Sequence, residues 1–360
     1  MSLPVKGRHI MDIAPSDGHP RNSEGAFLTL KDGRILFCYS AFFGENCEDH
    51  AKSGIAKIVS RDGGKTWSEP ETIAHYSDYN AVNIMSVSLM RMENGDVGIF
   101  YLIRQTFNDM RLVLRRSLDE GETWSEPVYC MNRKSYFVIN NDRVIRLKSG
   151  RILIPVAEHI PWTDNLERNF YHARAVATFF YSDDDGRTFS EMPESVALNG
   201  IKSPVGLQEP GAIELENGVI RAWARTDLGS QWDFYSMNGG ETWTAPSPTE
   251  FTSPVSPLSM KFLPDGRLFA IWNPIPNYVT RTFPEGTNGR HPLVYAVKNA
   301  DEKHFSKAQA IETDEKCGYC YTAIHPTEEG VLLAYCAGDG VKDKGLLNRL
   351  RITLLPYEEI

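Results

Sequence analysis

The stretch Ser60-Arg61-Asp62-Gly63-Gly64-Lys65-Thr66-Trp67 is one copy of an eight-residue pattern that recurs along the chain. Further copies are SLDEGETW at 117–124, SDDDGRTF at 182–189, SMNGGETW at 236–243 and the degenerate KNADEKHF at 298–305. The aromatic residues that end successive copies are 57, 65, 54 and 62 residues apart. A period of this length predicts radial repetition, with one supersecondary unit in each period.

The residue types of this pattern are those of a tight turn that ends in a packing side chain. Asp accepts hydrogen bonds from turn amides, and Gly supplies the positive φ that such a turn needs. Ser and Thr add local hydrogen bonds, and the final aromatic ring can pack between neighbouring units.

A second repeat, a short hairpin around a glycine, alternates with the first. The hairpin glycines are Gly33, Gly95, Gly150, Gly218, Gly266 and Gly330. Each glycine lies between two β-rich runs, a third strand leads into each eight-residue turn, and a fourth follows it. Each unit is therefore predicted to be a four-stranded antiparallel meander, and six hairpins predict six units. The N-terminal segment near Val5 to Ile13 is expected to supply the fourth strand of the last unit.

The eight-residue pattern is identified as the Asp-box, or bacterial neuraminidase (BNR) repeat. Over nearly its whole length the chain resembles the sialidase (neuraminidase) superfamily. That resemblance implies an all-β fold, a six-bladed β-propeller formed by residues 1–360 as a single domain. It also implies an exo-acting glycoside hydrolase that releases a terminal sugar from a carbohydrate substrate.

Composition narrows the function classes further. The net charge of −9 and the lack of a basic run argue against a nucleic-acid partner. No apolar stretch has membrane-spanning length, and the N-terminus lacks an apolar signal core, so we expect a cytoplasmic protein with no membrane partner. The six cysteines are scattered, and Cys317-x-x-Cys320 has no second pair, so we predict free thiols, no metal and no cofactor.

One position of each unit is expected to face the mouth of the central channel. Counting nine residues back from each hairpin glycine gives Glu24, Ser86, Asn141, Glu209, Pro257 and Tyr321. We interpret Ser86 and Pro257 as ordinary solvated positions at the start of a strand. The two glutamates, the tyrosine and Asn141 form a candidate wall of a binding site.

The resemblance assigns catalytic roles to three of the residues near this mouth. Gln208-Glu209-Pro210-Gly211 matches the family's E-P motif, whose Glu polarises a tyrosine nucleophile. Tyr321-Thr322-Ala323-Ile324 matches the stretch that supplies the nucleophile, with Tyr319 as the competing tyrosine. The family's acid/base aspartate lies eleven residues before the first Asp-box serine, at Asp49. A glutamate that accepts the phenol proton would activate a tyrosine whose ordinary pKa is near 10.

The chain departs from the family in the arginines that bind the substrate carboxylate. Glu24 stands at the position of the first arginine, where a negative charge would oppose a carboxylate. Arg21 and Arg225 are possible substitutes for the first and second arginines, and Arg290 matches the third. We therefore expect weak or no activity on simple sialosides, and a substrate whose hydroxyl groups approach Glu24.

Further candidates lie at the ends of the second strands of the units: Arg104, Glu158, His159 and Asn273. The tryptophans at 162, 223, 232 and 272 could stack on a sugar face or pack between units.

Three other functions remain open. Glu24 and Glu209 could be the carboxylate pair of an exo-glycosidase that acts on neutral sugars. The chain could instead be a carbohydrate-binding propeller without catalysis, or a lyase or isomerase of a sugar acid that uses Tyr321 and His159. The distance between Glu209 and Tyr321 discriminates between catalysis and binding alone. Nothing in the sequence bears on the oligomeric state.

Overall fold

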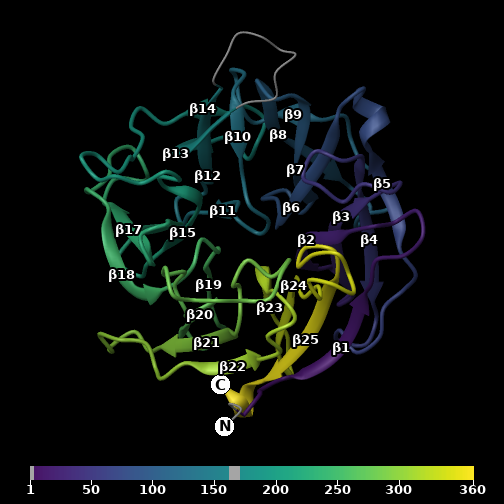
Figure 1. The fold of residues 1–360 in the computed structure, drawn as a ribbon. Helices are drawn as coiled ribbons and strands as arrows, with labels where there is room; N and C mark the ends of the chain where they lie inside the picture. The colour runs from purple at the N-terminus through teal and green to yellow at the C-terminus, as the bar shows by residue number, and fades with distance from the viewer. Residues whose placement is uncertain (1–3, 162–170) are drawn as a thin grey trace.

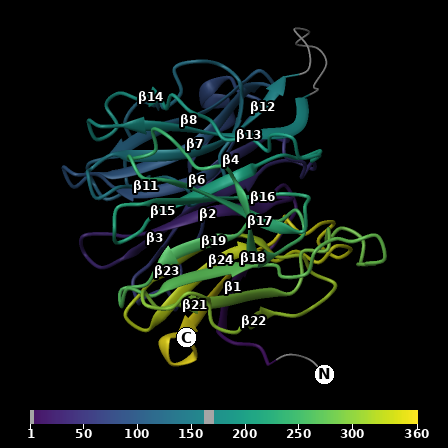
Figure 2. The ribbon, with the colours of Figure 1, turned by 90° about the vertical axis from the view of Figure 1, so that its left-hand side faces the viewer.

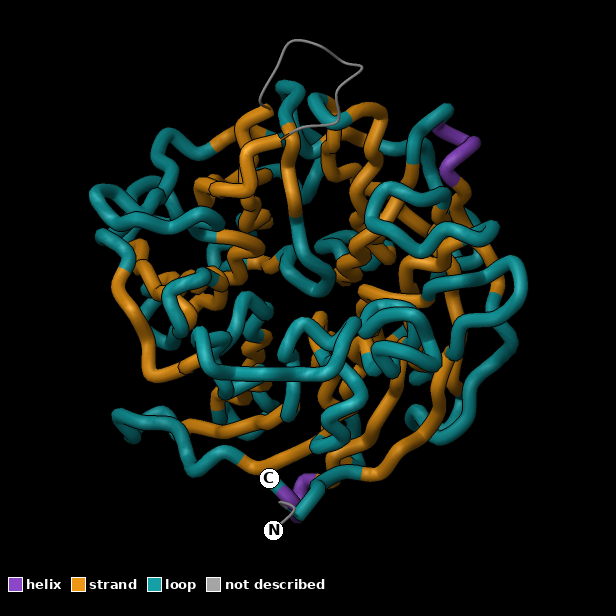
Figure 3. Tube along the Cα trace, viewed as in Figure 1, coloured by secondary structure: helices purple, strands orange, loops and turns teal. Residues whose placement is uncertain are grey.

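The computed structural model describes residues 4–161 and 171–360. Within these ranges the chain consists of β-strands and connecting loops. Its helical segments there are two short 3-10 turns, η1 (Tyr76–Tyr79) and η2 (Tyr357–Glu359), at the edge of the molecule (Figure 3). Neither has the length and apolar character that a membrane crossing requires.

The strands form five sheets arranged around a common centre (Figure 1). The first sheet contains β2 (Asn22–Thr29), β3 (Ile35–Phe42), β4 (Ser53–Ser60) and β5 (Glu71–His75). The second contains β6 (Asn83–Arg91), β7 (Val97–Thr106), β8 (Asp109–Ser117), β9 (Val128–Tyr129), β10 (Tyr136–Val138), β11 (Ile145–Arg146), β12 (Ile152–Pro161), β13 (Tyr171–Ser182) and β14 (Ser190–Glu191).

The remaining three sheets have four strands each. They are β15 (Gln208–Glu214), β16 (Ile220–Arg225), β17 (Ser230–Ser236) and β18 (Ser247–Thr252); β19 (Ser259–Phe262), β20 (Leu268–Trp272), β21 (Leu293–Lys298) and β22 (Gln309–Glu312); and β23 (Cys320–Pro326), β24 (Gly330–Cys336), β25 (Leu350–Pro356) and β1 (Arg8–Ile13). β1 pairs antiparallel with β25, so both ends of the chain share one sheet and lie at the same side of the molecule (Figures 1 and 2).

The all-β class and the four-stranded antiparallel sheets are confirmed, but the second sheet differs from the expectation of six separate sheets. It contains two meanders, β6 to β9 and β11 to β14, joined by β10. β10 pairs in parallel with β8 at Tyr136 and Met110, and antiparallel with β12. This short strand lies outside the repeated pattern, which is why the periodicity did not predict it.

Apolar side chains pack between every pair of neighbouring meanders. Six clusters of buried residues each combine two successive meanders. In one of them Phe179 of β13 stacks on Trp243, with ring centroids 4.2 Å apart. Another contains Phe37 of β3 and Leu332 of β24, so the first and last sheets also pack against each other. Burial of these side chains, rather than strand pairing, holds most neighbouring sheets together.

Four of the repeated turns contain the same pattern of hydrogen bonds. In the first, the Ser60 hydroxyl donates to Asp62 (2.9 Å) and accepts from the Gly64 amide (2.8 Å). Asp62 also accepts from the amide (2.9 Å) and hydroxyl (2.6 Å) of Thr66. The turns at 117–124 and 182–189 repeat these bonds, and Asn238 takes the place of Asp in the turn at 236–243. The degenerate copy at 298–305 differs, because the Asn299 amide donates to Glu302 (3.0 Å) instead.

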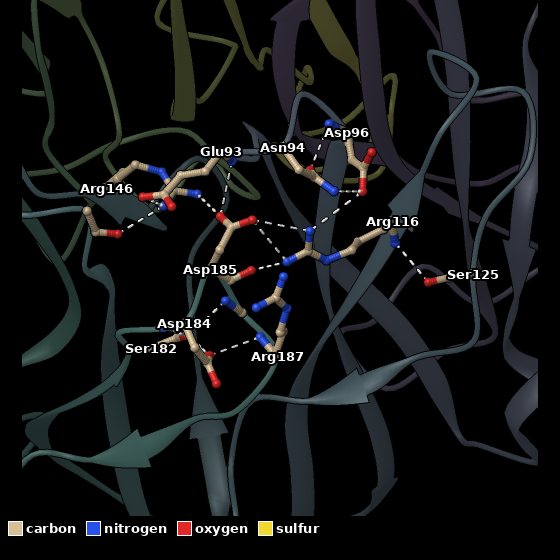
Figure 4. Close-up of polar contacts among 12 residues, drawn as sticks. Glu93, Asn94, Asp96, Arg116, Ser125, Arg146, Ser182, Asp184, Asp185 and Arg187 are labelled. Carbon is tan, nitrogen blue, oxygen red and sulfur yellow. Dashed lines mark hydrogen bonds and ion pairs between the residues drawn. The ribbon is translucent and has the colours of Figure 1, made fainter.

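The fourth residue of the turn at 182–189 also ties two meanders together (Figure 4). Asp185, with a φ of 58°, accepts hydrogen bonds from Arg146 Nη2 (2.6 Å), Arg116 Nη1 (3.3 Å) and the Glu93 amide (3.2 Å). Arg116 lies on β8 and Glu93 lies in the hairpin after β6, so both belong to the β6–β9 meander. Arg146 lies on β11, in the same meander as Asp185. The Asp185 carboxylate therefore contacts both meanders.

The same arrangement recurs one meander earlier. Glu120, with a φ of 60°, binds both terminal nitrogens of Arg91 (2.7 and 2.9 Å) and the Lys31 amide (2.8 Å). Lys31 and Glu93 are both two residues before a hairpin glycine. The repeated turn therefore positions an acidic side chain to satisfy a hairpin amide of the preceding unit.

We predict that Asp185→Ala lowers the free energy of unfolding by about 2 kcal/mol, because it leaves Arg116, Arg146 and the Glu93 amide without their shared acceptor. The control is Asp183→Ala. The Asp183 side chain pairs with Arg151 but is 55% exposed, so its loss should change the free energy of unfolding by less than about 0.5 kcal/mol. Urea denaturation measures both changes. Equal effects of the two substitutions would contradict this role of Asp185.

Candidate active site

The candidate site begins with an irregularity at the start of the inner strands. The pairing register shifts at Glu24 of β2, Ser86 of β6, Glu209 of β15 and Tyr321 of β23. These residues have φ values of 52°, 64°, 47° and 59°, in the left-handed region that side chains other than Gly rarely adopt. Each shift is a β-bulge, which redirects a side chain out of the regular alternation. Four of the six positions predicted by counting from the hairpin glycines are therefore backbone equivalents.

The four bulge residues line one pocket with a cavity volume of about 110 Å³. All four are buried, with exposed fractions between 4% and 8%. The other residues lining this pocket are Asp49, Met85, Leu102, Arg104, Met110, Tyr136, Val138, Ile139, Asn140, His159, Gln208 and Arg225. We call it the inner pocket.

Tyr321 and Glu209 both line the inner pocket and are hydrogen-bonded to each other. The Tyr321 hydroxyl donates to Glu209 Oε1 at 3.1 Å. Arg225 Nη1 lies 3.0 Å from Glu209 Oε2 and 3.4 Å from the Tyr321 hydroxyl, and its Nε donates to Gln208 (3.1 Å). The arginine thus fixes the Glu209 side chain against the phenol.

The buried surroundings keep Tyr321 protonated. Loss of water raises the pKa of the phenol well above its usual value of 10, and the charge of Glu209 raises it further, while Arg225 and Arg290 oppose the rise. A phenol with this pKa reacts as a nucleophile only if a base takes its proton during attack. Glu209 is the carboxylate within hydrogen-bond reach for that transfer.

Glu24 is protonated at neutral pH. Burial raises its pKa to about 8; the guanidinium of Arg21 lowers it, and the charges of Asp49 and Glu209 raise it. The Arg21 Nη2 atom lies 3.8 Å from Glu24 Oε2, which is beyond hydrogen-bond distance. The Ser86 hydroxyl lies 3.4 Å from the same oxygen. A carboxyl with this pKa is mostly neutral at pH 7, which argues against the expectation that Glu24 presents a fixed negative charge to the substrate. Below pH 8 this carboxyl can donate a hydrogen bond.

Asp49 lies at the rim of the inner pocket, and its side chain is 64% exposed. Partial removal from water raises its pKa, but Arg21 at 2.6 Å, with Arg104 and Arg290, lowers the pKa below its usual range. Asp49 also lines a second pocket outside the first, which we call the outer pocket, together with Arg21, His50, Arg104, Phe107 and Lys344. It therefore stands at the boundary between the two pockets.

Other predicted site residues lie elsewhere. Arg290 is buried behind Tyr321, where it donates to Cys320 Sγ (3.2 Å) and the Val255 carbonyl (3.1 Å) and does not line the inner pocket. The side-chain Nδ2 of Asn141 donates to the backbone carbonyls of Gly25 (2.7 Å) and Tyr321 (3.1 Å), so this side chain links two different sheets.

Several alternatives from the sequence also pack away from the site. Tyr319 is fully buried in an apolar cluster, which favours Tyr321 over its neighbour. Glu158 pairs with Arg133 at 2.6 Å, and the buried Asn273 binds Ser256 at 2.6 Å. The tryptophans at 223, 232 and 272 belong to the apolar clusters between sheets, and Trp162 lies outside the described residues.

His159 does line the inner pocket, and burial lowers its pKa to about 4, so it is neutral at pH 7. All six cysteines are free. Across the residues that the structure describes, no group of three or more His, Cys, Asp and Glu side chains could hold a metal ion.

The sequence reasoning missed Ser86, Tyr136, Asn140 and Gln208 as pocket residues. Ser86 stood at a predicted position but was interpreted as solvated, although it is 4% exposed. Asn140 and Gln208 each precede a predicted residue by one position. Tyr136 lies on β10, outside the repeat, so no periodic signal could have found it.

Residues 33–333 match the BNR repeat-like domain family, so the chain belongs to that family. It is 24% identical over 242 residues to a sialidase of Bacteroides fragilis (strain YCH46) and 25% identical over 244 residues to a sialidase of Clostridium perfringens. These matches include 57% and 60% of this chain but only 42% and 61% of the two relatives, respectively. Family and relatives together place the chain in the sialidase superfamily.

Solved structures share the fold at low sequence identity. A Dyadobacter fermentans protein of unknown function superposes with a TM-score of 0.72 at 21% identity, over 97% of this chain and 99% of that one. The leech intramolecular trans-sialidase gives 0.68 at 15% identity, over 98% of this chain and 70% of that chain. The intramolecular trans-sialidase of Ruminococcus gnavus gives 0.69 at 15% identity, over 98% of both chains.

We predict that Glu24→Gln becomes progressively more stable relative to the wild type as pH rises from about 4.5 to 8. A carboxyl whose pKa rises on folding stabilises the native state below its unfolded pKa, and that contribution is lost as pH rises through the folded pKa of about 8. The relative change should reach up to about 5 kcal/mol. Chemical denaturation at pH 5 to 9 measures it. A difference between the two proteins that does not vary with pH would mean that Glu24 is ionised throughout.

Proposed function

We propose that this protein is an exo-acting glycoside hydrolase with Tyr321 as its nucleophile, built as a six-bladed β-propeller whose mouth holds the inner pocket. The hydrogen bond of 3.1 Å between Tyr321 and Glu209 carries this proposal. A binding module has no need of a buried tyrosine, carboxylate and arginine in mutual contact. The sialidase names of the two relatives support the same class of reaction.

In the first step, the Tyr321 hydroxyl oxygen attacks the anomeric carbon while its proton passes to Glu209. The glycosidic carbon–oxygen bond breaks, and the leaving oxygen receives a proton. Water then attacks the same carbon, the bond to Tyr321 breaks, and the phenol recovers its proton from Glu209. Two displacements at one carbon retain the configuration of the sugar.

Asp49 is the proposed proton donor to the leaving group and the base for the attacking water. Its place at the boundary of the two pockets suits this role, because the glycosidic oxygen lies between the terminal sugar and the leaving group. Its ion pair with Arg21 opposes protonation, so acid assistance from Asp49 should increase toward acidic pH.

A second candidate is an exo-glycosidase that uses Glu24 and Glu209 as its carboxylate pair. One observation favours it, because Glu24 has the raised pKa that suits a general acid. Against it, Arg225 and the Tyr321 hydroxyl contact the two oxygens of Glu209, one each, so the phenol stands between this carboxylate and a substrate.

A panel of aryl glycosides, sialoside included, tests the activity. We expect at least one substrate to be hydrolysed, and Tyr321→Phe to lower kcat at least about a hundredfold, because the nucleophile is lost. The control is Tyr319→Phe, which should keep nearly full activity. Undiminished turnover by Tyr321→Phe would transfer the nucleophile role to a glutamate, and a panel with no turnover would favour a binding module.

The role of Asp49 predicts a dependence on the leaving group. Asp49→Asn should lower kcat/KM about a hundredfold for an alkyl or sugar leaving group, which needs a proton, and by less than about tenfold for 4-nitrophenol, which does not. Comparing the two substrates in wild type and variant measures this. Equal losses for both leaving groups would show that Asp49 does not donate the proton.

A further inference from the structure

A second cavity lies at the opposite end of the inner strands from the inner pocket. Gln208 and Glu209 at the start of β15 line the inner pocket, whereas Ala212, Ile213 and Glu214 at its end line the second cavity. A strand rises about 3.3 Å per residue, so the two cavities are separated by on the order of 10 Å along β15. The second cavity has a volume of about 370 Å³, and among the described residues none lines both. We call it the rear pocket.

Arg143 is buried in the wall of the rear pocket and is incompletely paired. It is 4% exposed, its Nη2 atom donates to the Leu258 carbonyl (2.6 Å), and its guanidinium lies over the ring of Trp223 (5.5 Å). That hydrogen bond is the one that the guanidinium makes within residues 4–161 and 171–360, and no carboxylate there lies within 4.0 Å of it. Most of its five N–H donors therefore have no protein acceptor.

Arg143 remains charged at neutral pH although it is buried. Burial lowers the pKa of its guanidinium to about 10, and the negative charges of Asp142 and Glu209 oppose the fall. A buried cation without a paired counterion is costly, and so is a buried donor without an acceptor. An anion bound at Arg143 would remove both costs.

Two neighbouring charges in the rear pocket are already paired with each other or with groups outside it. The Asp142 carboxylate accepts from Lys261 Nζ at 2.9 Å. Arg146 pairs with Asp185 at 2.6 Å (Figure 4). Neither acidic group therefore neutralises Arg143.

The lining as a whole is positively charged. The exposed Lys148 donates from Nζ to the carbonyl oxygens of Leu215 (3.1 Å) and Glu216 (2.8 Å), which leave its charge unneutralised. Four basic and two acidic side chains line the rear pocket, which gives it a formal charge of +2 in a chain whose net charge is −9. The basic residues are Arg143, Arg146, Lys148 and Lys261, and the acidic residues are Asp142 and Glu214. This sign favours an anionic ligand.

Much of the remaining wall is apolar. Its larger apolar side chains are Leu89, Val144, Ile213, Trp223, Met260 and Phe262. A ligand with an apolar body can bury that body against these side chains while its charged group faces Arg143.

We propose that the rear pocket binds a small organic oxyanion, a carboxylate or a phosphate ester, through the guanidinium of Arg143. A planar guanidinium can donate two parallel hydrogen bonds to either group, and Lys148 adds positive charge to the same pocket. This site is separate from the residues proposed for glycoside hydrolysis, so its occupation does not depend on that activity.

Calorimetric titration with matched anionic and neutral probes tests the proposal. The pairs are phenyl phosphate with phenol, and benzoate with benzamide. We expect the anion of at least one pair to bind about tenfold or more tightly than its neutral partner, and the tighter anion shows whether the pocket prefers phosphate or carboxylate. Arg143→Met should abolish the preference for the anion, Lys148→Met should weaken it severalfold, and the exposed control Arg187→Met should leave it unchanged.

A further variant distinguishes the rear pocket from the other two pockets. Arg104 lines the inner and outer pockets but not the rear pocket, so Arg104→Met should retain the binding that Arg143→Met loses. Anion binding that is lost in Arg104→Met and kept in Arg143→Met would overturn the proposal.

The wild type offers a test that needs no folded variant. Crystals would be soaked in the 4-bromo derivative of the tighter anion, and anomalous scattering would locate the bromine. We expect a peak in the rear pocket, beside Trp223. A peak confined to the inner or outer pocket, no peak at all, or equal binding of anionic and neutral probes in solution would contradict the proposed site while leaving the proposed hydrolysis untouched.

Discussion

The left-handed backbone at the start of the inner strands is the constraint on which the site depends. Such a conformation costs about 1 to 3 kcal/mol at each residue with a side chain and persists only where the surrounding structure enforces it. Here pairing with the second strand of each sheet resumes within three residues of the bulge and supplies that enforcement. The result is that Glu24, Glu209 and Tyr321, from three different sheets, meet in one pocket instead of alternating into the apolar layers between sheets.

Burial then determines the chemistry of the groups that meet. Tyr321 and Glu24 both hold their protons because the pocket withdraws them from water, whereas Glu209 and Asp49 are each matched by an arginine. A proton acceptor beside a protonated phenol suits the proton transfer that the proposed mechanism requires.

Much of this architecture could be predicted from the sequence, because both repeats are local. The turn residues and hairpin glycines predicted the meanders, and counting from the glycines located Glu24, Ser86, Glu209 and Tyr321. The count was one residue out at Asn141, since the left-handed residue there is Asp142. What the sequence could not predict depends on contacts between sheets: the β10 strand, the ion pair of Arg21 with Asp49, and the neutral state of Glu24.

The covalent attachment of a sugar to Tyr321 is the central claim, and trapping that intermediate tests it most directly. The protein would be treated with 2,3-difluorosialic acid, or with the 2-fluoro glycosyl fluoride of whichever sugar it hydrolyses, digested, and examined by peptide mass spectrometry. We expect the peptide containing Tyr321 to gain the mass of the fluorinated sugar. A label on Glu24 or Glu209, or inactivation with no label on Tyr321, would contradict it.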